Sequence, residues 1–134
     1  MPNVEVRGSV DLRGRPLIRI TVIGFDDELV AMVDTGFNGE LLMSEKVAAE
    51  WGISPVGLAA KLELGDGSKI FAGRGTVPVF WMGKRRAIAV QITPSSKGKK
   101  QSSEPVALIG TRLLSEDILE INFPAQTVVI RQAG

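Results

Sequence analysis

The stretch LVAMVDTGFNG, residues 29–39, runs five apolar residues directly into an acid. The apolar run, Leu29 to Val33, is typical of a strand that is buried in a protein core. Asp34 follows it at once, and Thr35 and Gly36 follow Asp34. An ionised carboxylate is costly to bury without partners, so the sequence requires something to balance Asp34.

The composition excludes several classes of function. The chain has 134 residues, 44% of them hydrophobic, which predicts one domain over residues 1–134 with its own core. There is no cysteine, histidine or tyrosine. Disulfides, thiol nucleophiles, Ser-His-Asp catalysis and most zinc sites are therefore ruled out, and Asp, Glu and Lys are left for acid–base chemistry. We expect no metal and no cofactor.

The sequence offers little evidence about location or large partners. The first ten residues lack the basic-then-apolar pattern of a signal peptide, and no apolar run approaches the length of a membrane helix. We therefore expect a soluble, cytoplasmic protein without membrane contact. The polar stretch at 94–104 and the basic residues at 84–86 could form a basic patch. Solvated turns are the favoured interpretation, because the net charge is only +1, so no nucleic-acid partner is predicted.

Short strand-like segments dominate the chain, and Gly and Pro punctuate them. This pattern predicts a mainly β fold with one or two short helices, arranged as a sandwich or a barrel. The helices are expected at 44–51 and 112–117, with Ser44 and Thr111 as caps. The expected strands are 4–12, 17–25, 28–34, 61–64, 69–82, 86–93, 105–110, 118–123 and 127–132.

Three motifs occur in an informative order. VDTG (33–36) comes early, the glycine-containing hairpin LELGDGSKI (62–70) lies in the middle, and LIG (108–110) comes late. In this order and spacing the chain, from about residue 17 to 131, resembles the retropepsin-like aspartic proteases, the single-domain retroviral-type family and its bacterial relatives. The resemblance implies a closed, barrel-like acid-protease domain that works as a homodimer, with the hairpin as a flap. It also implies that Gly110 packs beneath the loop that carries Asp34.

Aspartic proteases use two facing carboxylates that share one proton and add water to a peptide carbonyl. This chain contains a single Asp-Thr-Gly, so the second acid would come from a second copy across a twofold axis. The resemblance makes Asp34, Thr35 and Gly36 the catalytic motif, and the second Asp34 would balance the first. Pairing of exposed strand edges at 4–10 and 127–132 is expected to complete the dimer interface.

The resemblance also implies a peptide or protein substrate. Phe37 and Asn38 would contact it from one side, and the flap tip, Gly65, Asp66 and Gly67, from the other. Phe37-Asn38-Gly39 departs from the small residue and acids that are usual in retroviral members, and a core role suits Phe37 equally well. Trp51 and Trp81 are expected in the core.

Other interpretations of the motif stay open at this point. Asp34 could be a purely structural acid that accepts hydrogen bonds in its own turn. The chain could also be a non-catalytic protease-fold module for binding or dimerisation, or a monomeric barrel that closes its hairpin over a small apolar ligand.

Overall fold

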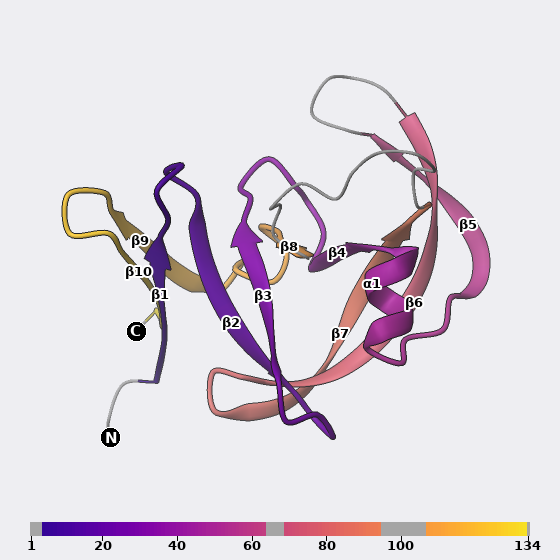
Figure 1. The fold of residues 1–134 in the computed structure, drawn as a ribbon, viewed down its shortest axis with the longest axis horizontal. Coiled ribbons are helices and arrows are strands. Elements are labelled where there is room, and N and C mark those ends of the chain that lie inside the picture. Colours follow the sequence, from indigo (N-terminus) through magenta and orange to yellow (C-terminus); the bar gives the residue numbers. More distant parts are fainter. Residues whose placement is uncertain (1–3, 64–68, 95–106, 134) are drawn as a thin grey trace.

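The protein is almost entirely β in a computed structural model that describes residues 4–63, 69–94 and 107–133 (Figure 1). The only helix within these residues is α1 (Glu45–Glu50). The strands are β1 (Glu5–Val10), β2 (Pro16–Val22), β3 (Glu28–Val33), β4 (Leu41–Ser44), β5 (Val56–Glu63), β6 (Lys69–Trp81), β7 (Lys84–Thr93), β8 (Ala107–Ile109), β9 (Asp117–Asn122) and β10 (Thr127–Gln132).

Six of these strands close into a barrel. The hydrogen-bonded order β2-β3-β8-β4-β7-β6 returns to β2 because Thr21 and Val22 pair with Phe80 and Val79 of β6. Strands β1, β10 and β9 extend the sheet from β2 on one side, and β5 extends it from β6 on the other (Figure 1). The predicted mainly β, closed-barrel fold is therefore confirmed, and of the two alternatives the barrel is correct.

Apolar residues fill the barrel in the period-2 pattern that strands require. Paired inward positions on neighbouring strands meet in register, for example Ile18 with Ala31 and Val33 with Ile109. Among residues 4–55, 73–94 and 107–133, no polar or charged residue is buried. Trp81 belongs to this core, and Trp51 packs against it from the end of α1. Both tryptophans therefore have the structural role expected of them.

The first predicted helix is confirmed and the second is wrong. The Ser44 hydroxyl accepts a hydrogen bond from the Val47 amide at 3.2 Å and so caps α1. Residues 111–116 instead form turns that lead into β9. The Thr111 hydroxyl, the expected cap, donates to the carbonyl oxygen of Phe37 at 3.3 Å. A six-residue segment without its cap has too few internal hydrogen bonds to be a stable helix.

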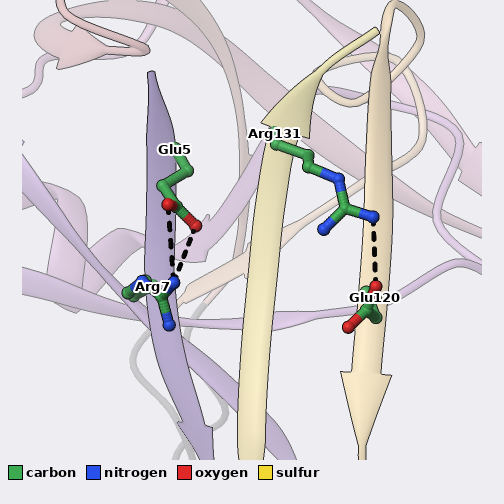
Figure 2. Close-up of polar contacts among 4 residues, drawn as sticks. All are labelled: Glu5, Arg7, Glu120 and Arg131. Carbon is green, nitrogen blue, oxygen red and sulfur yellow. Dashed lines mark hydrogen bonds and ion pairs between the residues drawn. The ribbon is translucent and has the colours of Figure 1, made fainter. Parts of the chain in front are cut away.

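The layer formed by β1, β10 and β9 carries two ion pairs on one face (Figure 2). Arg7 pairs with Glu5 at 3.3 Å and Arg131 with Glu120 at 3.1 Å, in exposed positions where such pairs add little stability. β10 is hydrogen-bonded to β1 on one side and to β9 on the other. The prediction that 127–132 offers a free edge to a second chain is therefore wrong, because the chain fills both edges of that strand itself.

Candidate active site

Asp34 lies at the barrel end where two central strands finish together. β3 and β8 are parallel, with Val33 opposite Ile109, so the segments that follow them leave from the same end of the barrel. The Asp34 amide donates to the carbonyl oxygen of Ile109 at 2.9 Å. This contact brings the VDTG motif (33–36) and the LIG motif (108–110) side by side. The two motifs begin 75 residues apart in the chain.

The Asp34 carboxylate is half-buried in a tight turn. Its Oδ1 accepts a hydrogen bond from the Gly36 amide at 2.9 Å, and the Phe37 amide donates to the Asp34 carbonyl at 3.1 Å. Among the described residues, no donor lies within hydrogen-bond distance of Oδ2. The carboxylate therefore has a structural role through one oxygen, while the other is available to a water or a second acid. The Thr35 side chain is exposed.

The loop after Asp34 rests on Gly110, as predicted. The amides of Gly110, Thr111 and Arg112 donate to the carbonyl oxygens of Glu40 (3.1 Å), Phe37 (2.9 Å) and Gly39 (3.2 Å). A Cβ atom at position 110 would lie 2.4 Å from the oxygens of both Phe37 and Gly39. Only glycine allows this approach, so the late Leu-Ile-Gly motif is a support for the loop that carries Asp34.

Phe37 and Asn38 have different environments. Phe37 is only 8% exposed, and its ring packs under its own loop, where it touches the positions of Gly39 and Gly110. Asn38 is exposed, and with Phe37 it lines a groove of about 840 Å³ beside the loop. The core interpretation of Phe37 is therefore correct, and little of the residue is left to reach a bound molecule.

Glu40 is a structural residue of the site that the sequence analysis missed. Its Oε1 accepts from the Ala89 amide at 2.9 Å, and its Oε2 accepts from the Arg86 guanidinium at 2.5 Å. Strand pairing between β4 and β7 begins only at Leu41 and Val90, so the Glu40 carboxylate extends that ladder by one position. The one sequence signal for this role is an acid directly before the apolar strand 41–43.

The predicted flap falls partly outside the described residues. β5 and β6 form an antiparallel hairpin, with Leu62 opposite Ile70 and Glu63 opposite Lys69. The tip residues Gly65, Asp66 and Gly67 lie outside the described part, as does most of the polar stretch 94–104. The hairpin is therefore observed, and its action as a flap stays a prediction.

Comparison with known proteins is informative only at the level of structure. Neither a family of known proteins nor a curated protein matches the sequence. Among solved structures, a retropepsin-like aspartic protease from Rickettsia conorii matches with a TM-score of 0.64 and 16% identity, over 98% of this chain and 92% of that one. The chain has the fold of the retropepsin-like aspartic proteases. The EIAV protease, solved with the inhibitor HBY-793, matches with a TM-score of 0.57 and 14% identity, over 78% of this chain and 89% of that one.

The retropepsin-like fold confirms the resemblance seen in the sequence motifs. The homodimer and the roles of the individual site residues remain predictions. Within the described ranges, no helix is long and apolar enough to cross a membrane. The same ranges contain no group of three or more His, Cys, Asp or Glu side chains arranged to hold a metal ion.

Proposed function

We propose that this chain is an aspartic endopeptidase that acts on peptide or protein substrates as a homodimer in the cytoplasm. The observation that carries the proposal is the environment of Asp34. One carboxylate oxygen holds the turn together, the other has no donor among the described residues, and Gly110 supports the loop from below. The retropepsin-like barrel, with this arrangement at the end of β3, supports the assignment of Asp34 to one half of an aspartic protease site.

The second half would come from a second copy of the chain. Two Asp34 carboxylates that face each other share one proton, because two adjacent negative charges repel strongly. The ionised carboxylate takes a proton from water, and the protonated one donates a hydrogen bond to the oxygen of the peptide carbonyl. The exposed Thr35 hydroxyls lie next to the acids in sequence and would hold the two turns together. The 62–70 hairpin would close over the substrate and exclude water.

Cleavage of a mixed peptide library between pH 3 and pH 9 tests the proposal. The rate should be bell-shaped in pH, because only the singly protonated pair contains both a base and an acid. Asp34→Asn should abolish cleavage. Asp27→Asn changes an exposed acid before β3 and should leave the rate unchanged. Comparable cleavage by Asp34→Asn and the wild type would remove Asp34 from catalysis. No cleavage of any library peptide by the wild type would leave a non-catalytic binding or dimerisation module as the better description.

Mixing the two proteins tests whether the site is shared. In a ninefold excess of Asp34→Asn, random exchange of subunits leaves only about a tenth of wild-type chains with a wild-type partner. The cleavage rate per wild-type chain should fall in the same proportion if each site needs two Asp34 residues. An unchanged rate per wild-type chain, after exchange has been verified by mass spectrometry, would show that one chain is sufficient.

A further inference from the structure

The groove beside the Asp34 loop has no role in the chemistry described so far. It has a volume of about 840 Å³, and four segments line it: residues 36–40, 74–76 and 89–91, together with Arg112. It begins at Gly36, two residues after Asp34. An extended peptide advances about 3.3 Å per residue, so a chain bound at Asp34 and running along the loop would reach the groove within a few residues.

The groove is positively charged. Arg74 on β6 and Arg112 after β8 line it, and both are exposed. No carboxylate of the described residues forms an ion pair with either of them. Glu40 is the acid that lines the groove, and both of its oxygens are already engaged, by Arg86 and by the Ala89 amide. Within the described part of the chain, these two guanidinium groups therefore have no counter-charge.

The remaining walls suit the side chain of a peptide. The exposed Ala89 and the small exposed part of Phe37 are the apolar contributions to the wall and can contact methylene groups. Asn38 is exposed and contributes an amide that can donate or accept hydrogen bonds. Guanidinium groups bind carboxylates through two parallel N–H donors, which makes an acidic side chain the best-matched occupant.

We infer that Arg74 and Arg112 make this groove a specificity site for an acidic residue of the peptide substrate. The inference rests on the proposed protease function. The acidic residue would lie a few positions from the cleaved bond, with its carboxylate against the two guanidinium groups and its methylenes against Phe37. Neither arginine touches the reacting atoms, so both determine which peptides bind well.

Cleavage of matched peptides measures this preference. In the fastest-cleaved library peptide, each position is replaced in turn by Glu and by Gln. At one position near the cleaved bond, kcat/KM should favour Glu by about fivefold, the effect of two partly exposed ion pairs. The preference should appear mainly in KM and should weaken in high salt. In the double variant Arg74→Gln/Arg112→Gln, the ratio of kcat/KM for the Glu peptide to that for the Gln peptide should approach one.

Arg19→Gln provides the matched control, because Arg19 is an exposed arginine on β2 that does not line the groove. It should keep both the wild-type rate and the Glu preference. Equal cleavage of the Glu and Gln peptides at every position by the wild type would overturn the inference and leave the protease function intact. Retention of the full preference by the double arginine variant would overturn the inference in the same way.

A binding experiment separates failure of the inference from failure of the protease function. N-acetyl-glutamate N-methylamide and its glutamine counterpart are titrated into ¹⁵N-labelled wild-type protein. The glutamate compound should shift the amide signals of residues 36–40, 74–76 and 112 at about a fivefold lower concentration than the glutamine compound, and the double arginine variant should lose this difference. Localised glutamate-specific shifts in a protein that cleaves no peptide would support the acid site and refute the protease. Identical responses to both compounds would refute the acid site.

Discussion

Replacing Gly110 by alanine tests the support beneath the Asp34 loop. The new Cβ would lie 2.4 Å from the carbonyl oxygens of Phe37 and Gly39, and 2.6 Å from Cδ2 of the Phe37 ring. Two of these three neighbours are backbone atoms, so the loop itself must move. The movement would stretch the hydrogen bonds that the amides of Gly110, Thr111 and Arg112 donate to this loop.

The structure sets the size of the effect. Overpacking in a dense region costs about 1–3 kcal/mol, and weakening of the three hydrogen bonds equivalent to the loss of one of them adds about 1 kcal/mol. We expect the free energy of unfolding to fall by about 2–4 kcal/mol. For a domain of this size that corresponds to a drop in Tm of roughly 10 °C. Because the displaced loop carries Asp34, a shift near 1 Å should also lower peptide cleavage by about 100-fold in the protein that remains folded.

Two other glycines provide controls for this experiment. Gly14 has a φ of +79° and nothing within 4 Å of its hypothetical Cβ, so Gly14→Ala should cost only about 1 kcal/mol through backbone strain. A Cβ at Gly8 would lie 2.0 Å from the Leu17 carbonyl oxygen, a severe clash far from the Asp34 loop in the sequence. Gly8→Ala should lose stability yet keep cleavage at temperatures where it is folded. Calorimetry measures the Tm of each variant, and peptide cleavage is measured at 20 °C. A Gly110→Ala protein that melts within about 1 °C of wild type would refute the reasoning.

Three further predictions concern stability in urea. Ser44→Ala removes the cap of α1 and should lower the free energy of unfolding by about 1 kcal/mol, with Ser44→Asp close to wild type. Glu40→Ala leaves the Ala89 amide without its side-chain acceptor and should cost about 1 kcal/mol, more than Glu40→Gln, which keeps an acceptor oxygen. Burial raises the pKa of Asp117 above 3.8, so its charged form opposes folding at neutral pH. Asp117→Asn should be more stable than wild type at pH 7, and the advantage should fade as the pH falls through the raised pKa; a less stable variant at pH 7 would contradict this.

The sequence alone determined the features that depend on neighbouring residues. Alternating apolar residues specify strands, and Ser44 with Gly52 bounds α1, because strand periodicity, caps and turns act over a few positions. The turn at Asp34 is equally local, since its carboxylate accepts from an amide two residues later. The strand pattern left a sandwich and a barrel open, and the family resemblance carried by the three motifs implied the closed barrel, which the retropepsin-like fold of the structure confirms.

Only the tertiary structure decided how distant segments meet at the site. Thr111 appeared to be a helix cap, but its hydroxyl bonds Phe37, 74 positions earlier, and the expected helix does not form. Glu40 reaches Ala89 across 49 positions, and Arg74 and Arg112 enter one groove from two different segments. Strand register and barrel closure set these contacts, and neither is encoded in the propensities of neighbouring residues. The motif around Asp34 could therefore be recognised in the sequence, whereas the support beneath it and the charge beside it could not.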